Sequence, residues 1–402
     1  MPIEDGREVP AEAITDDEVA EWYNEEESQE DEAPPPVPDK AIEQKYADSQ
    51  IQIVRSTIDF TLHTLKQSLK DPNYINISPT YQRRTRWDRK RRSLLIESFL
   101  MNIPVPPIFL FENQYNQYET MDGRQRLETI RDFLESGFAL VGLEYFTELN
   151  GRRFDDLNPT LQRGLLRRSI TAIVLLAETT RPDASPHDVR MILFRRLNTG
   201  GARLNPQEMR NALYPGHFNK KLATIARSVP FTQIWGIPGR TPDEDERVPK
   251  ELMKNALYRN MADCELVLRF FAIRETIENE LKGSIRHLLD KCMERHSSDV
   301  EATVNLHEAQ YQQCLNTMFQ TFDLRPFILP TTNRPSRPLY DALMVALSLQ
   351  ANYDPLPIKE QIQKRLVEAL ENTRTYDILI GRGNTIEAIR DRVALAHRIL
   401  RG

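Results

Sequence analysis

The sequence has no long hydrophobic run, and a membrane-spanning helix needs about 18 or more consecutive apolar residues. We therefore expect no membrane span in its 402 residues. Its first residues, MPIEDGREVP, lack the basic start and apolar core of a signal peptide. Cysteine is also scarce: Cys264, Cys292 and Cys314 are far apart and match no zinc spacing or disulfide framework. We expect a cytoplasmic protein in a reducing compartment.

Several catalytic signatures are missing as well. The chain has no GxxxxGK[ST] phosphate loop and no HExxH motif. No histidine pairs with a cysteine at a familiar ligand spacing, and no Ser–His–Asp arrangement can be argued from spacing. The sequence therefore predicts no metal site. The seven histidines are His63, His187, His217, His287, His296, His307 and His397.

Charge is distributed unevenly along the chain. Residues 1–39 hold 15 Asp or Glu and one Arg, a net charge of −14, so the remainder carries +8 of the total of −6. An acidic leader thus precedes a basic body. The body could bind a phosphate-rich partner, and the leader could oppose that binding.

The acidic leader ends in the proline-rich segment PPPVP. This composition predicts a largely disordered segment with a stiff exit. It could be a solubilising tail. Alternatively it could be a partner-docking or self-masking arm, because Val19, Trp22 and Tyr23 would share one face of a short helix.

Three regions follow from these patterns: an acidic disordered leader at 1–40, an α/β domain at 41–235 and a helical C-terminal domain at 236–402. The last boundary rests on the turn-rich segment GIPGRTPDEDERVPK. The predicted fold class is α+β, a small mixed core followed by an all-helical region. The helices expected there are 260–283, 301–322, 338–350, 358–372 and 384–401.

Elements of the α/β region are predicted from periodicity and caps. Asp88 should cap a helix that ends before the prolines at 104–107, and Asn205, Pro206 and Glu208 should open another. The remaining expected elements are a helix at 58–69, strands at 108–112 and 117–121 joined as a hairpin, a helix from Gly123 to about 135, a strand at 169–177 and a helix at 185–197.

The first candidate motif is YETMDGRQRLETIRDFL, a strand followed by a helix. Free N–H groups and the dipole of a helix start attract anions, and Gly123, Arg124 and Arg126 lie there. Asp122 could cap the helix or hold a metal, while Gln125 could orient a water or contact a phosphate. An ordinary surface helix with solvated arginines is the alternative.

The second motif, YQRRTRWDRKRR, has seven basic residues among the ten from Arg83 to Arg92. Guanidiniums beside Tyr81 and Trp87 are suited to a phosphate backbone and stacked bases. The alternative is a solvated basic face with Trp87 in the core. The residues predicted to contact DNA are Arg84, Arg86, Arg89, Lys90, Arg91 and Arg92.

The third motif, LNTGGARLNPQEMRNALY, places a glycine-rich loop before a capped helix. Asn198, Gly200 and Gly201 could form an anion-binding nest of backbone N–H groups. A plain connection between two helices is the alternative.

Together, TYQRRTRW, LLIESFLMNIPVPPIFLF, YETMDGRQRLETIRDFL and FRRLNTGGARLNPQEMRNALY resemble the N-terminal S-type domain of GmrSD-like type IV restriction enzymes, of the ParB/sulfiredoxin-like superfamily. The resemblance covers about residues 50–270. It implies a small mixed α/β core with a nucleotide site.

The resemblance also implies roles for particular residues. Asp122, Gly123, Gln125 and Arg126 match the family signature Asp-Gly-Gln-Gln-Arg, and Arg124 replaces its first glutamine, as in the phosphate motif of ParB proteins. Asp122, Gln125 and Arg126 would be catalytic. The residues that would bind an NTP with Mg²⁺ are Tyr81, Gln82, Arg83, Gly123, Arg124, Arg126, Asn198, Gly200 and Gly201.

Full-length members of the family often carry a C-terminal HNH nuclease domain. After residue 300 this sequence has only His307 and His397, in no His-Asn-His pattern. The resemblance therefore implies a stand-alone S-type subunit that works with a partner nuclease or with a second copy of the chain.

Three hypotheses remain open. The first is a nucleotide-binding, DNA-interacting subunit of a bacterial restriction or phage-defence system, with NTP hydrolysis to NDP and phosphate as its enzyme activity. The second is a non-catalytic, nucleotide-gated DNA-binding regulator. The third is a metal-dependent DNA-nicking nuclease that uses Asp122 and Glu128.

Overall fold

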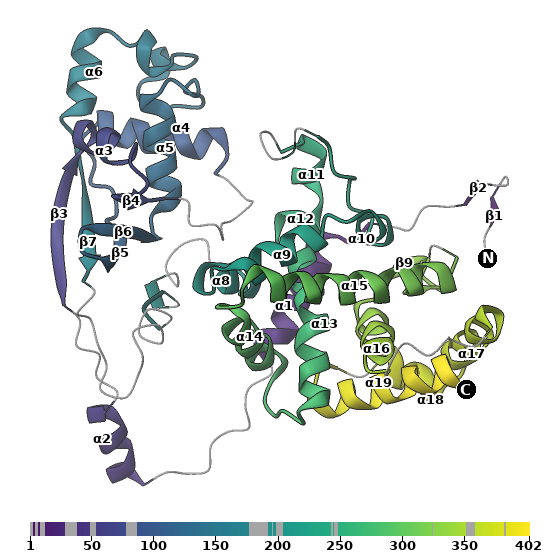
Figure 1. Cartoon of the computed structure of the whole chain (residues 1–402). Helices are drawn as coiled ribbons and strands as arrows, with labels where there is room; N and C mark the ends of the chain where they lie inside the picture. Colours follow the sequence, from purple (N-terminus) through teal and green to yellow (C-terminus); the bar gives the residue numbers. More distant parts are fainter. Residues whose placement is uncertain are drawn as a thin grey trace. The chain divides into compact units, whose positions relative to one another are not determined.

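The computed structural model describes residues 3–4, 7–8, 13–28, 38–48, 54–77, 87–176, 192–194, 196–197, 204–242, 244, 248–323, 325–350, 358–381 and 383–402. These residues form two compact units (Figure 1). The sheet unit comprises the described residues from Asp39 to Leu204. The helical unit comprises those before Pro35 and those from Asn205 to Gly402.

The sheet unit contains strands and helices in alternation. Its elements are α2 (Asp39–Asp48), β3 (Arg55–Thr61), α3 (Leu62–Ser68), β4 (Ile75–Asn76), α4 (Arg89–Leu100), β5 (Ile108–Gln114), β6 (Gln117–Asp122), α5 (Arg124–Leu134), the 3₁₀ helices η1 (Thr147–Leu149) and η2 (Phe154–Asp156), α6 (Pro159–Leu166) and β7 (Ser169–Leu175).

The five strands form one mixed sheet in the order β3-β7-β5-β6-β4. β5 and β6 are an antiparallel hairpin, as the sequence predicts. β7 pairs antiparallel with β3 and parallel with β5, and β4 pairs parallel with β6. The predicted hairpin therefore occupies the middle of the sheet, and the β6–α5 turn follows directly from it.

The core of this unit lies between the sheet and its helices. Along β7, Ile170, Ala172 and Val174 are fully buried while the residues between them are partly exposed, the alternation of a strand with one covered face. Helices α3, α4, α5 and α6 pack against one another beside the sheet (Figure 1). They contribute Leu65, Ile96, Phe99, Leu127, Ile130, Phe133 and Leu165 to the core.

The helix predicted at 58–69 is partly wrong. Its first residues belong to β3, which pairs with β7 through contacts such as Thr57 with Ile173. Only Leu62–Ser68 is helical, and the Thr61 hydroxyl accepts a hydrogen bond from the Thr64 N–H to cap it. Strand pairing with a segment more than 100 residues away outweighs the local helical pattern.

A buried carboxylate fixes the loop after α5. Glu97 of α4 is 4% exposed and accepts hydrogen bonds from the N–H groups of Glu144, Tyr145 and Phe146, at 2.9–3.1 Å. Burial opposes the charge of Glu97, but these three donors lower its pKa below the ordinary value. The ionised carboxylate therefore ties this loop to α4.

The helical unit contains the remaining elements. They are β1 (Ile3–Glu4), β2 (Arg7–Glu8), α1 (Asp16–Ser28), α8 (Pro206–Leu213), α9 (His217–Ile225), α10 (Val229–Ile234), α11 (Lys250–Lys254), α12 (Ala256–Arg259), α13 (Ala262–Glu278), α14 (Ile285–His296), α15 (Glu301–Thr321), β8 (Ile328–Leu329), β9 (Arg334–Pro335), α16 (Arg337–Ser348), α17 (Lys359–Glu371), α18 (Thr373–Tyr376), the π-helix η4 (Asp377–Gly381) and α19 (Ile386–Arg401).

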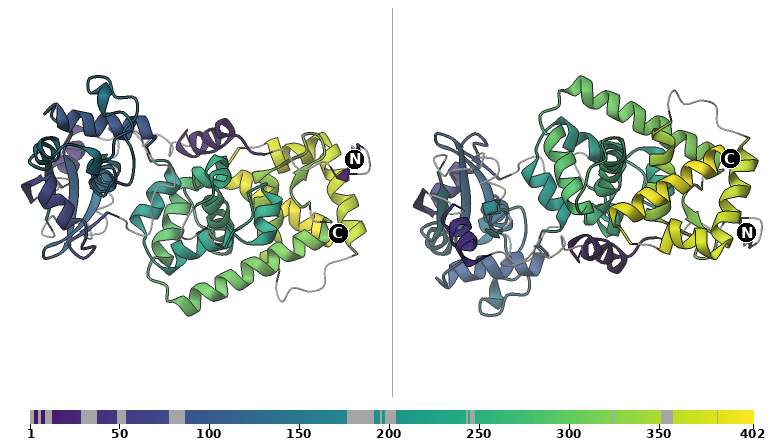
Figure 2. Two further views of the ribbon diagram at one scale, coloured as in Figure 1. Left: turned by 90° about the horizontal axis from the view of Figure 1, so that it is seen from above. Right: turned by 90° about the horizontal axis from the view of Figure 1, so that it is seen from below.

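Two features of this unit differ from the prediction. The division between units falls after Leu204, not after residue 235, because α8, α9 and α10 pack with the C-terminal helices. In addition, the sequence patterns did not predict α14 or the shorter helices α9, α10, α11, α12 and α18. The five predicted C-terminal helices are present as α13, α15, α16, α17 and α19, and α16 and α19 lie side by side (Figure 2).

The acidic leader is not disordered throughout. Asp16–Ser28 forms α1, which packs against α12 and α14. Val19 and Tyr23 are buried, and the Tyr23 hydroxyl donates a hydrogen bond to the Asn260 carbonyl at 2.9 Å. The shared face predicted for Val19, Trp22 and Tyr23 is therefore turned towards this chain's own helices.

Ion pairs attach α1 to the helical unit. Glu26, 2% exposed, pairs with Arg210 of α8, which also contacts Glu265 at 3.2 Å and Asp290 at 2.9 Å. Burial and the neighbouring Glu26 raise the pKa of Glu265 above its ordinary value. The Arg210 charge thus compensates carboxylates from three helices.

The predicted fold class is confirmed: the protein is α+β, with a small mixed sheet and a helical C-terminal region. Among the described helices, none has the length and apolar character that crossing a membrane requires.

Replacing Glu97 by Gln should destabilise the sheet unit. The glutamine amide is uncharged, and its NH₂ group would face the N–H donors of the loop. We therefore expect the free energy of unfolding to fall by about 1–3 kcal/mol near neutral pH. Because the pKa of Glu97 is lowered, its contribution is present above the unfolded pKa and is lost as the pH falls through the folded value. Denaturant unfolding at several pH values measures this. The exposed Glu148→Gln is the control, and equal stability of both variants at neutral pH would contradict the role of Glu97.

Replacing Glu26 by Ala should loosen α1. Arg210 would keep its contacts with Glu265 and Asp290, so we expect the free energy of unfolding to fall by about 3 kcal/mol or less. We also expect faster proteolysis within Asp16–Ser28. Limited proteolysis followed by mass spectrometry locates the cleavage. Glu21→Ala, on the exposed face of the same helix, is the control. Identical cleavage of the two variants would show that the buried pair does not hold α1.

Candidate phosphate and nucleic-acid site

Gly123 forms the turn between β6 and α5. Its φ of +92° is in the left-handed region that glycine adopts readily. A Cβ at this position would lie 2.4 Å from Ile108 Cγ2 and 3.0 Å from Arg126 Nη2. Glycine is therefore required here by its left-handed backbone conformation and by the side chains of Ile108 and Arg126 packed against the turn. No side chain in the described part of the chain caps α5, and Asp122 has a different partner.

Each arginine at the start of α5 pairs with a carboxylate. Arg126 Nη2 donates to Asp122 Oδ2 at 2.9 Å and to the Pro107 carbonyl at 3.1 Å. Arg124 Nε donates to Glu128 Oε1 at 2.7 Å. All four charged side chains are at least two-thirds buried. The guanidiniums are therefore held in fixed orientations and are not the solvated arginines of an ordinary surface helix.

This pairing sets the electrostatics of the turn. The charges of the two arginines and the two carboxylates cancel. Any attraction of the turn for an anion therefore comes from the helix dipole and from basic residues nearby. Arg126 Nε is buried and makes no hydrogen bond to the described residues. The turn can thus orient a bound anion, while neighbouring elements would have to supply the net positive charge.

Gln125 connects the turn to the second motif. Its Oε1 accepts a hydrogen bond from the Trp87 N–H at 3.1 Å. Trp87 lies immediately before α4, which is capped by Asp88 through the Arg91 N–H at 2.7 Å, as predicted. The structure therefore brings the start of α4 next to the start of α5.

The basic residues of α4 have different environments. Arg89, Lys90 and Arg91 are exposed, and the Arg91 guanidinium lies 4.6 Å from the centre of the Trp87 ring. Arg92, by contrast, pairs with Asp132 at 2.8 Å and covers the Phe138 ring. Arg92, predicted to bind DNA, thus has a packing role within the unit, while three exposed cations remain on the first turn of α4.

Part of the predicted site lies outside the described residues. The cap of α8 is confirmed, because Asn205 and Glu208 exchange side-chain to backbone hydrogen bonds. The site residues outside the described part are Tyr81, Gln82, Arg83, Arg84, Arg86, Asn198, Gly200 and Gly201.

Groups of His, Cys, Asp and Glu that could hold a metal occur in the helical unit, among the described residues. They are Glu275 with Cys292 and His296, and His296 with Asp299 and His307. Neither includes Asp122 or Glu128, both of which pair with arginines. The sequence prediction missed these groups, although the four-residue spacing of Cys292 and His296 would have been a signal once α14 was known.

The chain was compared with protein families, curated proteins and solved structures. Residues 63–215 match the family described as GmrSD restriction endonuclease, N-terminal domain. No curated protein and no solved structure matched the chain significantly. The match begins in α3 and ends just after α8, so it contains the β6–α5 turn and the α4 basic residues.

The resemblance predicted from the motifs is thus confirmed for this segment: residues 63–215 match the N-terminal domain of GmrSD restriction endonucleases.

Proposed function

We propose that the protein is a nucleotide-binding, DNA-interacting subunit of a restriction or phage-defence system. The family match supports the restriction role. The observation that carries the nucleotide part is the β6–α5 turn. No side chain among the described residues caps the 11-residue helix α5, and two oriented arginines lie at its start.

In this proposal the phosphates of an NTP lie at the start of α5. The helix dipole and the backbone N–H groups favour anions there. Arg126 would be the main side-chain ligand, since its guanidinium already lies against Gly123 and its buried Nε makes no hydrogen bond within the described part of the chain. Mg²⁺ would accompany the triphosphate, as in other nucleotide sites. By the family resemblance, Arg83, Asn198, Gly200 and Gly201, which lie outside the described residues, would also take part in nucleotide binding.

The exposed cations of α4 would contact DNA. Arg89, Lys90 and Arg91 are exposed on the first turn of α4, which begins two residues after Trp87, and the Trp87 N–H donates a hydrogen bond to Gln125. A nucleotide on the α5 turn would therefore lie near the DNA-binding residues. The helical unit would dock a partner nuclease or a second copy of the chain.

Binding without hydrolysis is favoured by one observation. Gln125, the residue that could orient an attacking water, already accepts the Trp87 N–H. Both nearby carboxylates are engaged by arginines. A nucleotide-gated DNA-binding regulator is therefore the second candidate, and phosphate release distinguishes it from an NTPase.

Arg126→Ala should abolish or strongly weaken nucleotide binding. Removing a charge-assisted contact to phosphate costs about 1.5–3 kcal/mol, a loss of affinity of at least tenfold. Equilibrium binding of each of the four NTPs with Mg²⁺, with phosphate release followed in parallel, measures this on the full chain. Arg126→Lys should give an intermediate affinity, because it keeps the charge without the forked geometry.

The matched control is Arg131→Ala, near the other end of the same helix, which removes the same charge. Thermal unfolding of each variant confirms folding. Nucleotide affinity equal to wild type in folded Arg126→Ala would sink the proposal, as would the absence of any NTP binding by the wild type.

Arg89→Gln combined with Lys90→Gln should weaken DNA binding at low salt. Each phosphate contact contributes close to one unit to the slope of log K against log salt, so the slope should fall by about two. Titrations of duplex DNA at several salt concentrations measure it. Lys250→Gln with Lys254→Gln, exposed on α11, removes equal charge as a control. An unchanged slope in the α4 variant would exclude these two residues from the interface.

A further inference from the structure

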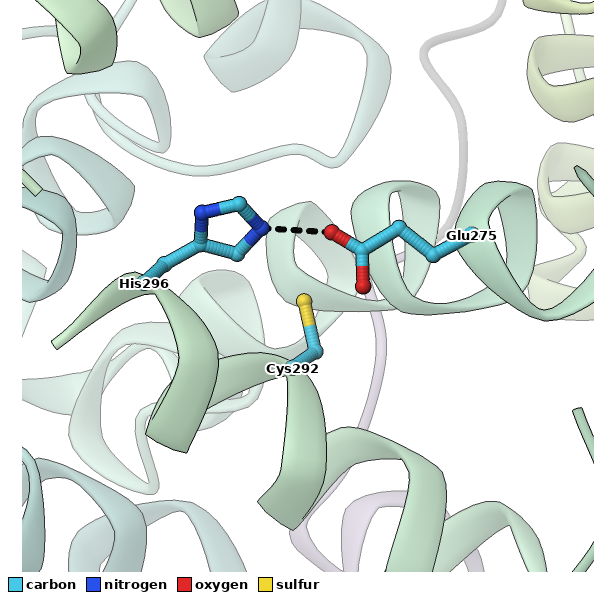
Figure 3. Close-up of side chains that lie close together, drawn as sticks. All are labelled: Glu275, Cys292 and His296. Carbon is cyan, nitrogen blue, oxygen red and sulfur yellow. Dashed lines mark hydrogen bonds and ion pairs between the residues drawn. The ribbon is translucent and has the colours of Figure 1, made fainter. Parts of the chain in front are cut away.

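Three potential metal ligands converge between two helices of the helical unit. Glu275 lies near the end of α13, and Cys292 and His296 lie one turn apart on α14. A carboxylate oxygen, the Cys292 sulfur and a ring nitrogen of His296 all lie within 4.8 Å of one another. Figure 3 shows the three side chains pointing towards a common point.

From this arrangement we propose that Glu275, Cys292 and His296 bind a zinc-class divalent cation that links α13 to α14. Zinc sites combine thiolate, imidazole and carboxylate ligands, with bonds of about 2.0–2.3 Å. Thiolate in the set selects zinc over magnesium or calcium. The thiol proton would leave to solvent when the metal binds.

The contacts around His296 define which nitrogen faces the metal. Its Nε2 lies 2.5 Å from Glu275 Oε1, on the side of Cys292. Its Nδ1 lies 2.7 Å from Asp299 Oδ2. Metal-binding histidines usually donate their second ring N–H to a carboxylate, which fixes the tautomer. Asp299 is placed to accept that bond, leaving Nε2 for the metal.

Glu275 and Cys292 are positioned in a similar way. The second oxygen of Glu275 pairs with Arg295, so its other oxygen is directed towards His296. Cys292 is fully buried. The ligands are therefore held by the packing of α13 against α14 rather than by a surface loop. His296 Nε2 and Glu275 Oε1, now 2.5 Å apart, would have to separate to about 3.3 Å to bind one tetrahedral metal ion.

A neighbouring group offers an alternative cation position. His296 Nδ1, Asp299 and His307 also lie within 4.8 Å of one another, with His307 Nε2 3.5 Å from Asp299 Oδ2. That group lacks a thiolate and would use the nitrogen that now contacts Asp299. The cysteine-containing group is therefore the stronger site for zinc, and the two can be separated spectroscopically.

The test is metal content and cobalt spectroscopy of the purified full chain. We expect one zinc per chain by elemental analysis. After chelation, titration with Co²⁺ should produce visible tetrahedral bands and a near-ultraviolet thiolate-to-cobalt charge-transfer band. The spectrum of the wild type alone tests the thiolate ligand, so the result does not depend on a variant folding.

Variants then assign the ligands. Cys292→Ser should remove the charge-transfer band, and His296→Gln should abolish stoichiometric binding. Cys314→Ser, a change at another fully buried cysteine, should behave as the wild type. Asp299→Asn should retain the band while weakening affinity by about 10–100-fold. Circular dichroism checks that each variant is helical.

Two outcomes would overturn the proposal. One is the absence of stoichiometric zinc or cobalt binding, which would leave a metal-free network of hydrogen bonds and ion pairs. The other is cobalt binding that shows no thiolate charge-transfer band and is lost in His307→Ala. That result would place the metal in the neighbouring group.

Discussion

The helical unit depends on the compensation of one buried guanidinium. Arg210 is 1% exposed, and a cation so far from water is tolerated only when carboxylates surround it. Glu26, Glu265 and Asp290 meet this requirement from α1, α13 and α14, so four helices including α8 are fixed by a single charge. The Asp16–Ser28 segment of the acidic leader is consequently part of a folded unit. Removing it to test whether it competes with DNA would also remove Glu26, so charge substitutions on its exposed face are the cleaner experiment.

Helix caps and short turns could be predicted from the sequence, because each depends on only a few neighbouring residues. Asp88 caps α4 and Asn205 caps α8 as predicted, because each cap needs only the side chain and the next three residues. The central hairpin was equally predictable from its turn. β3 was not, since it forms by pairing with a strand far along the chain. For α1 the sequence offered a short helix only as an alternative to disorder, and it did not predict that this helix packs on the chain's own helical unit.

The local structure of the β6–α5 turn was predicted, but the charge balance of its side chains was not. The sequence correctly placed Gly123 at the turn and the two arginines at the start of α5. However, Asp122 precedes Arg126 by four residues and Arg124 precedes Glu128 by four, the spacing at which side chains on a helix meet. Considering the arginines as isolated cations therefore overstated the positive potential of the turn. The spacing of Cys292 and His296 is a similar case, because it places both side chains on one face only if α14 is recognised as a helix.

The order of α1 and its partner along the chain has a consequence for biosynthesis. Arg210 follows Glu26 by 184 residues, so α1 leaves the ribosome well before the arginine with which it pairs. The whole sheet unit is translated in between. At about 5–20 residues per second, α1 would wait on the order of 10 seconds or more with Val19 and Tyr23 uncovered. Its many acidic residues would keep this nascent segment hydrated during the delay. Closure of so long a loop makes completion of the helical unit a late step, after the sheet unit has had time to fold.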